Sequence, residues 1–316
     1  MSTISIRPVQ PHQRRQALRL SLAGELGAAL EHRVNALLEY ARALSLDMSR
    51  QWFLEKGGRA ISACTCIESP GRTAMLVFPV GRFFGADLEA LRQLIEHVAA
   101  EESKRDICLL QALIEVDDEE GRQALEGAGF RQIAVLLYLE MKWKGAAQAT
   151  ATPPVELQRR SWEWISYSEA SSRKFANLIE ATYEGGLDCP GLSELRDIDD
   201  VIAGHKAAGR FDPRRWSLLE CDGKPKACIL LSENPLRPVL EVVYMGVHPS
   251  IRGKGVGQYV LDYGLQLARA EGFGGVTLAV DSGNHPARAL YRSVGFEQTH
   301  RRRAMIRSLG LTSNPP

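Results

Sequence analysis

Two segments of this 316-residue chain repeat one short pattern about half a chain length apart. The carboxy-terminal copy reads Ala-Leu-Tyr-Arg-Ser-Val-Gly-Phe and ends at Phe296, and the amino-terminal copy reads Ala-Leu-Glu-Gly-Ala-Gly-Phe and ends at Phe130. Their glycines, Gly129 and Gly295, lie 166 positions apart, and a strand-like run follows each copy. Such self-similarity indicates an internal duplication, so we expect two similar domains.

A stretch of small residues divides the two copies. Residues Gly145 to Pro154 read Gly-Ala-Ala-Gln-Ala-Thr-Ala-Thr-Pro-Pro, which offers no side chain able to anchor a core and is typical of a linker. The chain also exceeds the usual size of one hydrophobic core. We therefore expect one domain over residues 1–145 and a second over residues 155–316.

Hydrophobic periodicity predicts the same order of elements in both halves. In the first half, strands are expected at 4–9, 51–54, 60–67, 73–80, 107–116 and 135–141, and helices at 13–23, 28–44, 87–100 and 119–128. In the second half, helices are expected at 168–183, 198–208, 255–271 and 286–293, and strands at 216–221, 226–232, 239–247, 275–280 and 298–306. This order predicts a mixed α/β fold with helices on both faces of one sheet in each domain.

Composition excludes several classes of partner. Apolar residues make up 45% of the chain, charged residues make up 24%, and the formal net charge is +1. This balance is that of a globular protein and gives no electrostatic reason to expect nucleic acid or an anionic membrane as a partner. The segment Met1 to Arg15 lacks the apolar core of a signal peptide, and no apolar run reaches the roughly 20 residues of a membrane span. A cytoplasmic protein is expected.

The six cysteines do not form C-x-x-C pairs. Cys64 and Cys66 are two positions apart, which places them on the same face of a strand. Reduced, structural thiols are favoured over a disulfide framework or a zinc site, so no metal is expected.

A glycine-rich turn follows the apolar strand that ends at Val247. It reads Arg-x-x-Gly-x-Gly, with Arg252, Gly255 and Gly257, and it opens a predicted helix. Glycines allow consecutive N–H groups to point outward at a helix start, where the helix dipole favours a phosphate. A dinucleotide-binding fingerprint requires a different glycine spacing and an acidic residue about 20 positions later, and a purely structural turn is the remaining alternative.

A second pattern follows this turn, with the spacing Asn-x-x-Ala-x-x-Leu-Tyr-x-x-x-Gly-Phe from Asn284 to Phe296. Taken together, the two patterns resemble the acetyl-CoA-binding core of the GCN5-related N-acetyltransferases (GNAT). The resemblance covers roughly the second half of the chain. It implies two tandem GNAT domains, each a mostly antiparallel sheet flanked by helices, and acetyl-CoA as the co-substrate.

The resemblance also implies a set of binding residues. Backbone N–H groups near Met245 and Val247 become candidates to polarise the acetyl carbonyl, and Asn284 to contact the pantetheine arm or a phosphate. For Asn284, helix capping is an alternative that is compatible with binding. The turn that holds the pyrophosphate comprises Arg252, Gly253, Lys254, Gly255, Val256 and Gly257.

Two residues are candidates for proton transfer. Tyr291 resembles the general acid of the family, because a phenol with a reference pKa near 10 can donate a proton to the departing CoA thiolate. Its alternative is a tyrosine that only packs against the sheet. Glu241 occupies the position that resembles the family's base, where an apolar strand could raise its pKa. A water chain or a solvated edge carboxylate is the alternative.

The resemblance places the acceptor near the connection between the first two helices of the second half, from Glu184 to Gly191. Glu184 and Asp188 are candidates to hold a cationic substrate, although a solvated loop is an alternative. The basic run from His300 to Arg303 is a candidate for the 3′-phosphate of CoA, or else an exposed strand with alternating charges.

The first half departs from the pattern where chemistry is expected. Its loop from Gly81 to Asp87 places two phenylalanines and an acid at the helix start, and Leu125 stands at the position of Tyr291. The sequence therefore predicts an N-acetyltransferase with catalysis in the second domain and a small-molecule or peptide amine as acceptor. A non-catalytic acyl-CoA-binding or sensing module is the alternative.

Overall fold

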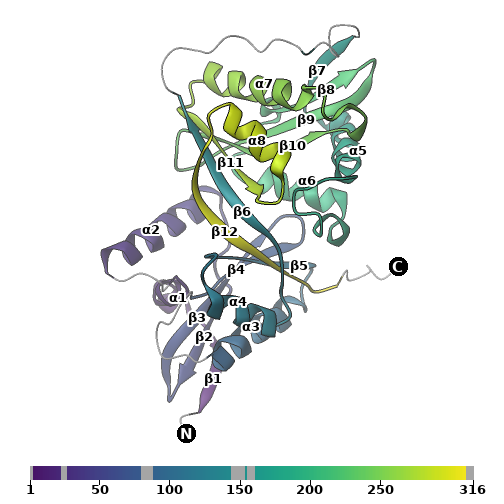
Figure 1. Ribbon diagram of the computed structural model, residues 1–316. Coiled ribbons are helices and arrows are strands. Elements are labelled where there is room, and N and C mark those ends of the chain that lie inside the picture. The colour runs from purple at the N-terminus through teal and green to yellow at the C-terminus, as the bar shows by residue number, and fades with distance from the viewer. Residues whose placement is uncertain (1–2, 23–26, 80–87, 144–153, 155–160, 311–316) are drawn as a thin grey trace. The chain divides into compact units, whose positions relative to one another are not determined.

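The computed structural model describes residues 3–22, 27–79, 88–143, 154 and 161–310. The chain divides into two compact units, which are coloured along the chain in Figure 1. Unit 1 comprises Met1–Val135 and Arg302–Pro316, and unit 2 comprises Leu136–Arg301. Each is described by itself below.

Unit 1 is a mixed sheet with helices on both faces. Its strands are β1 (Ile4–Pro8), β2 (Gln51–Lys56), β3 (Arg59–Ser69), β4 (Thr73–Val77) and β5 (Leu109–Ile114), which lie in this order. Only the β4–β5 pairing among these is parallel. The helices are α1 (Arg14–Ser21), α2 (Ala28–Ala43), α3 (Leu88–Glu102) and α4 (Glu119–Gly127).

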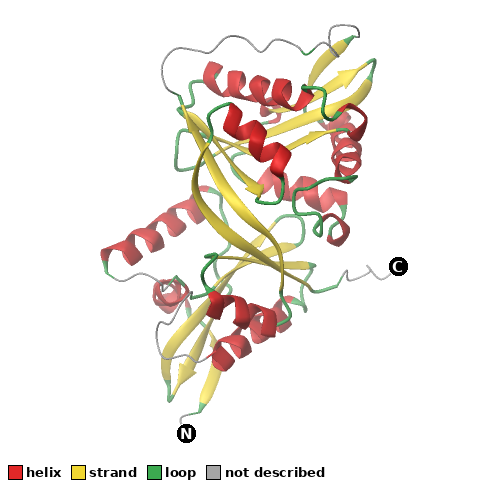
Figure 2. Cartoon of the chain, in the orientation of Figure 1, coloured by secondary structure: helices red, strands yellow, loops and turns green. Residues whose placement is uncertain are grey.

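Unit 2 repeats this arrangement, as Figure 2 shows with strands and helices in separate colours. Its strands lie in the order β7 (Trp162–Ser166), β8 (Trp216–Cys221), β9 (Lys224–Glu233), β10 (Leu240–Val247) and β11 (Gly275–Asp281). The β10–β11 pairing is parallel and the others are antiparallel. The helices are α5 (Ser172–Tyr183), α6 (Ile198–Ala207), α7 (Val256–Ala270) and α8 (His285–Ser293).

The last strand of each sheet comes from the other half of the chain. β6 (Arg131–Lys142) follows α4 of unit 1, but its residues Leu136 to Lys142 pair antiparallel with β11 of unit 2. Conversely, β12 (Glu297–Ser308) follows α8, and its residues Arg303 to Ser308 pair with β5 of unit 1. The contiguous domains 1–145 and 155–316 expected from the sequence therefore differ from the compact units by these exchanged strands.

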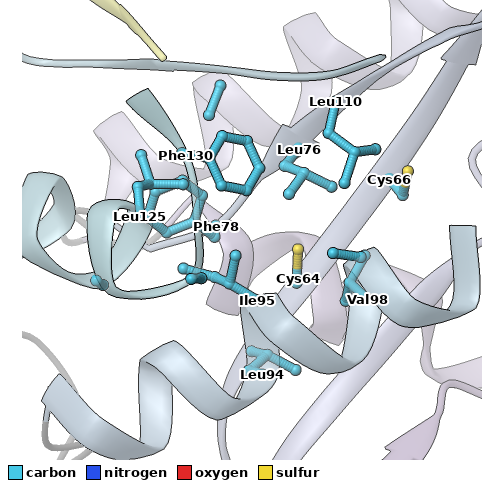
Figure 3. Close-up of a cluster of buried hydrophobic side chains, with 14 of the residues drawn as sticks. Cys64, Cys66, Leu76, Phe78, Leu94, Ile95, Val98, Leu110, Leu125 and Phe130 are labelled. Carbon is cyan, nitrogen blue, oxygen red and sulfur yellow. The ribbon is translucent and has the colours of Figure 1, made fainter. Parts of the chain in front are cut away.

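Successive side chains of a strand point to opposite faces of the sheet, so each face buries its own set of side chains. In unit 1, α3 and α4 pack on the face shown in Figure 3, where Cys64 and Cys66 of β3 lie in one apolar cluster with Leu94, Ile95 and Leu125. Burial raises the pKa of both thiols, so they stay protonated. The same-face prediction for Cys64 and Cys66 is confirmed.

In unit 2, the two faces of β9 serve different helices. Cys228 and Leu230 pack in the cluster built with α5 and α6. Ile229 and Leu231 point to the opposite face, where a Cβ at Gly264 of α7 would lie 2.5 Å from Ile229. The glycine lets α7 approach the sheet closely enough to position the start of that helix.

The predicted order of elements is confirmed, with one strand missed. β7 was not predicted because its run, Trp-Glu-Trp-Ile-Ser, is short and only partly buried. The linker from Gly145 to Pro153 and the loop residues Gly81 to Asp87 lie outside the described residues.

Candidate active site

The candidate site of unit 2 begins where two neighbouring strands separate. β10 and β11 pair in parallel from Leu240 opposite Val276 to Val242 opposite Leu278. Beyond this point β10 stays paired with β9, and β11 stays paired with β6. A register shift between Val242 and Tyr244 accompanies the separation. One edge of β10 is thereby left without its parallel neighbour.

A cleft of about 260 Å³ opens between the separated strands. Its walls come from β10, the end of β11, the start of α8 and the connection that follows α5 (Figure 1). The lining residues are Thr182, Tyr183, Gly185, Gly186, Leu187, Asp188, Val242 to Val247, Arg252, Leu278, Ala279, Val280, Asn284, Pro286, Ala287 and Tyr291. The fold therefore brings together six residues predicted from distant positions: Asp188, Met245, Val247, Arg252, Asn284 and Tyr291. Of the described residues, those of the predicted turn from Gly253 to Gly257 are not among the lining residues.

The backbone of β10 directs polar groups toward this cleft. The N–H of His248 donates to the carbonyl of Lys226, at the β9 side, over 2.8 Å. Because backbone groups of successive strand residues point to opposite edges, the N–H groups of Val247 and Met245 point to the open edge. The carbonyl of Val247 indeed accepts from Arg252 Nε there, at 2.9 Å. A bound carbonyl or amide can pair with this edge as an added strand would.

The glycine-rich turn ends at the first residue of α7. Gly253 and Gly255 have φ values of 73° and 78°, in the left-handed region that favours glycine, and no side chain caps the helix. The N–H groups of the first turn, including Val256 and Gly257, have no intrahelical partner, and the helix dipole makes this end attractive to an anion. A Cβ on Gly257 would meet only Leu290 and Val247 at 3.6 Å or more, so internal packing does not itself require glycine there.

Arg252 is used differently from the sequence-based expectation. Its guanidinium donates to the carbonyls of Val247, Glu184 and Thr182 at 2.9, 2.7 and 2.6 Å. These bonds join the end of β10 to the end of α5, the two sides of the cleft. The guanidinium that was predicted to contact a pyrophosphate is therefore already engaged in holding the two sides of the cleft together. Lys254, in the same turn, is exposed to solvent.

Tyr291 and Asn284 belong to α8 and its cap. The Asn284 side chain accepts from the N–H of Ala287 at 3.2 Å, which confirms the helix-capping alternative, and it also lines the cleft. Tyr291 is 7% exposed, and its ring packs edge-on against the ring of Phe296, with 5.7 Å between the two ring centroids. Burial, and then the nearby Asp188 carboxylate, raise the pKa of Tyr291, so the phenol remains protonated.

Asp188 lies on the loop between α5 and α6, beside the cleft. Its Oδ1 accepts from the N–H of Asp281 at 2.8 Å, and Asp281 Oδ2 accepts from the N–H of Cys189 at 3.2 Å. This reciprocal pair fixes the loop against the end of β11. The residue as a whole is exposed to solvent. Protein atoms packed around its carboxyl group nevertheless desolvate it and raise its pKa. Glu184, the other predicted carboxylate, is exposed and supplies its carbonyl to Arg252.

Glu241 lies on β10 ahead of the separation, in register with Ser232 and Thr277. Burial raises the pKa of its carboxyl to about 7. Burial, and then the Glu241 charge, raise the pKa of Tyr138 to about 12. The raised pKa expected from the apolar strand is confirmed. Within the described part of the chain, however, the residues that line the cleft do not include Glu241.

A second pocket of about 170 Å³ adjoins the cleft and was not predicted in detail. The two share Tyr183, Gly186, Asp188, Val243 and Tyr244. The pocket adds Cys189, Pro190, Leu192, Arg196, Val201 and His205. The Tyr244 hydroxyl lies 2.5 Å from Thr182 Oγ1. No local sequence signal distinguishes Arg196 or His205, because each is one polar residue near or within an amphipathic helix.

The basic run near the end of the chain has other contacts. His300 stacks on Tyr138 with ring centroids 4.1 Å apart. Arg302 pairs with Glu115, and Arg303 donates to the Val116 carbonyl at 2.6 Å, both within unit 1. Arg302 and Arg303 are only partly exposed and engaged in these contacts, so they match neither the exposed-strand alternative nor a free role at the 3′-phosphate.

The described residues contain neither a metal-binding cluster nor a helix suited to a membrane. No group of three or more His, Cys, Asp or Glu side chains there could hold a metal ion. None of the helices described has the length and apolar character that a membrane crossing requires.

Known sequences similar to this chain are acetyltransferases. Residues 173–296 match the acetyltransferase (GNAT) family. A mycothiol acetyltransferase from Thermobifida fusca is 27% identical over 267 residues, which cover 76% of each protein. A mycothiol acetyltransferase from Thermomonospora curvata is 40% identical over 172 residues, and this match spans 53% of each protein, about half its length.

Comparison with solved structures agrees with the fold. A GCN5-related N-acetyltransferase from Sphaerobacter thermophilus has a TM-score of 0.64 at 16% identity, covering 97% of this chain and 96% of that one. A tandem GNAT protein from the clavulanic acid biosynthesis pathway has a TM-score of 0.51 at 16% identity, covering 98% and 99%. Identities this low show the fold alone. The tandem arrangement, expected to be similar to that of mycothiol synthase, agrees with these matches.

Proposed function

We propose that this chain is a GNAT acetyltransferase, and that it is an acetyl-CoA-dependent N-acetyltransferase whose reaction takes place in the cleft of unit 2. One observation carries the proposal: the open edge of β10 and the Tyr291 phenol line one cleft, and Arg252, which also lines it, leads into the uncapped start of α7. These are three different groups, and acetyl-CoA presents a matching partner for each. The pantetheine amides suit the strand edge, the pyrophosphate suits the helix start, and the thioester sulfur suits a proton donor.

In this proposal the turn from Gly253 to Gly257 binds the pyrophosphate with backbone N–H groups. The acetyl carbonyl accepts a hydrogen bond from the N–H of Met245 or Val247 at the open edge. Such a donor stabilises the oxyanion formed when the amine adds to the carbonyl. One donor typically lowers the activation free energy by about 2.7 to 4 kcal/mol.

The proton balance requires an acid and a base. The amine nitrogen forms a bond to the acetyl carbon, the carbon–sulfur bond breaks, and Tyr291 donates its proton to the CoA thiolate. The proton lost by the amine passes to Glu241 or to a water chain. Since Glu241 is not a lining residue, a direct contact with the amine is not supported, and a route through water fits its position better.

For unit 1 we propose no corresponding reaction. Leu125 stands at the position of Tyr291, and it is fully buried in the apolar cluster of Figure 3. A leucine supplies no proton, so catalysis is assigned to unit 2 alone.

The test measures acetyl-CoA binding and CoA thiol release with the whole protein. The acceptor set includes small amines, peptides and the unacetylated precursor of mycothiol, since relatives are named for mycothiol. Amine-dependent thiol release is expected. Tight acetyl-CoA binding without release for any acceptor would instead support a sensing module, and absence of binding would refute both functions.

A further inference from the structure

The pocket beside the cleft carries opposite charges at its two ends. We call it the acceptor pocket, because it opens into the cleft through the shared residues Tyr183, Asp188 and Tyr244. Asp188 belongs to both spaces, whereas Arg196 and His205 line only the acceptor pocket. A negative charge therefore lies on the side of the thioester, and a positive charge lies farther from it.

The Asp188 carboxylate is held in place at the shared wall. The N–H of Asp281 donates to its Oδ1, and the Asn284 side chain also hydrogen-bonds to the carboxylate. A carboxylate has about four acceptor positions, so these two bonds leave lone pairs for a ligand. Asp188 lines the cleft together with Tyr291 and Tyr244, so the carboxylate lies near the candidate acid and near the mouth of the pocket. An ammonium bound by Asp188 would thus be close to the place where the acetyl group is transferred, and it releases one proton to water before its nitrogen attacks the thioester.

The far end offers a cation and a neutral imidazole. Arg196 is oriented by a 2.9 Å bond from its Nη2 to the carbonyl of Asp200, and its charge acts on Tyr183 and His205. His205 Nε2 is buried and has no hydrogen-bond partner among the described residues. Burial and then Arg196 lower the pKa of His205 to about 4, so the ring is neutral near pH 7. A buried polar atom without a partner is costly unless a ligand or water satisfies it.

The remaining walls limit the size and shape of a ligand. Leu192, Val201 and Val243 make the sides apolar. With a volume of about 170 Å³ and these apolar sides, the pocket suits an acceptor with a small side chain.

From these observations we propose that the acceptor pocket selects small amino acids as acetyl acceptors, with the ammonium on Asp188 and the carboxylate on Arg196 and His205. This inference rests on the proposed acetyltransferase function and adds the class of acceptor. Arginine binds a carboxylate through two parallel hydrogen bonds, which fixes the orientation of the acceptor and directs its amine toward the cleft.

The test compares matched acceptors with the whole protein. Each proteinogenic amino acid is assayed beside its amide and its decarboxylated amine, and CoA thiol release is measured. The expected result is at least one amino acid whose kcat/KM exceeds that of its own amide and amine by about tenfold or more, since a hydrogen-bonded charge contributes about 1.5 to 3 kcal/mol. Release with amides, amines or peptides that equals or exceeds release with every amino acid would overturn the inference and leave the acetyltransferase function intact.

Substitution of Arg196 tests whether this residue binds the carboxylate of the acceptor. Arg196→Met is expected to raise KM for the preferred amino acid by about 10- to 100-fold and to leave its amide unchanged. Arg173→Met removes an equivalent charge from the exposed side of α5, where Arg173 is 3.8 Å from Asp199, and should change neither acceptor. His205→Phe, which removes the unpartnered Nε2, serves as the second variant if Arg196→Met does not fold. Equal losses for the amino acid and its amide would assign Arg196 a structural role and contradict the proposal.

Acetyl-CoA binding and acceptor specificity can be measured separately. Unchanged acetyl-CoA affinity in Arg196→Met, measured by titration, is expected because Arg196 does not line the cleft. Failure of the wild-type protein to bind acetyl-CoA would refute the proposed function itself. Acetylation limited to acceptors without a carboxylate would refute only the amino-acid specificity.

Discussion

At the scale of single residues, Tyr291 allows catalysis to be separated from binding. Tyr291→Phe keeps the ring and its contact with Phe296 but removes the proton donor. Turnover should fall by about 10² to 10⁴, the usual range for general acid catalysis, while acetyl-CoA affinity stays nearly unchanged. Rate measurements and calorimetric titration check this. Tyr263→Phe, on α7 and outside the residues that line the cleft, is the matched control. Normal turnover in Tyr291→Phe would make the residue a packing contact only.

A second residue, Glu241, should impose a pH dependence on stability. Its folded pKa of about 7 exceeds the unfolded value of 4.5, so the folded protein keeps a proton that the unfolded chain releases. Stability is therefore greatest below pH 4.5 for this group and falls as pH rises from 4.5 to about 7, by roughly 3 kcal/mol in total.

Glu241→Gln should remove that part of the dependence. Urea unfolding of unit 2 at pH 5 and pH 8 would show the variant gaining stability over the wild type at the higher pH. Other titrating groups are the same in both proteins and cancel in the difference. Parallel pH profiles for the two proteins would mean that the carboxyl is hydrated in the folded state.

At the scale of elements, the start of α7 is expected to bind the pyrophosphate. Gly255→Glu would place a carboxylate at the helix start, against the bound anion, and should abolish CoA binding without unfolding unit 2. Gly272→Glu is a close control, because Gly272 has a φ of 81° just after the other end of the same helix and open space around its Cβ. Titration with CoA distinguishes them. Equal affinity in the two variants would locate the phosphate site elsewhere.

Arg252 tests whether the same turn depends on charge or on bracing. Arg252→Lys retains the positive charge but cannot reproduce three bonds to the carbonyls of Val247, Glu184 and Thr182. Stability of unit 2 should fall by about 2 kcal/mol, and acetyl-CoA affinity should fall with it. Denaturant unfolding and titration measure the two effects. Unchanged stability with weakened binding would instead assign the guanidinium to the phosphate.

At the scale of the whole molecule, the exchanged strands make each unit depend on both halves of the chain. Fragment 152–316 lacks Leu136 to Lys142, which pair with β11, so it should bind acetyl-CoA poorly on its own. Adding fragment 1–147 should restore binding, measured as a ligand-dependent shift in the unfolding midpoint. At about 100 times Kd, acetyl-CoA adds about 2.7 kcal/mol to the unit that binds it. Full affinity of the second fragment alone would show that its own last strand can fill the vacant edge.

Most of the helices, strands, turns and caps of this protein could be predicted from its sequence, because each depends on residues that are close together in the chain. Period-two and period-3.6 patterns define the strands and helices, and the glycines of the Arg252 turn and the cap at Asn284 act within a few residues of themselves. The positions of Met245, Val247, Asn284 and Tyr291 in one cleft followed from the family resemblance, since their order and spacing carry that information.

Other features depended on tertiary structure, because they join residues that are distant in sequence. The bonds from Arg252 to Thr182 and from Asp281 to Asp188 span 70 and 93 positions, and no local pattern specifies such partners. The same holds for His205, whose missing partner becomes visible only when α6 is packed. The strand exchange is the clearest case: β6 and β12 have similar patterns and could each extend either sheet. The sequence by itself determined that both are strands, and only the folded chain decided which edge each strand pairs with.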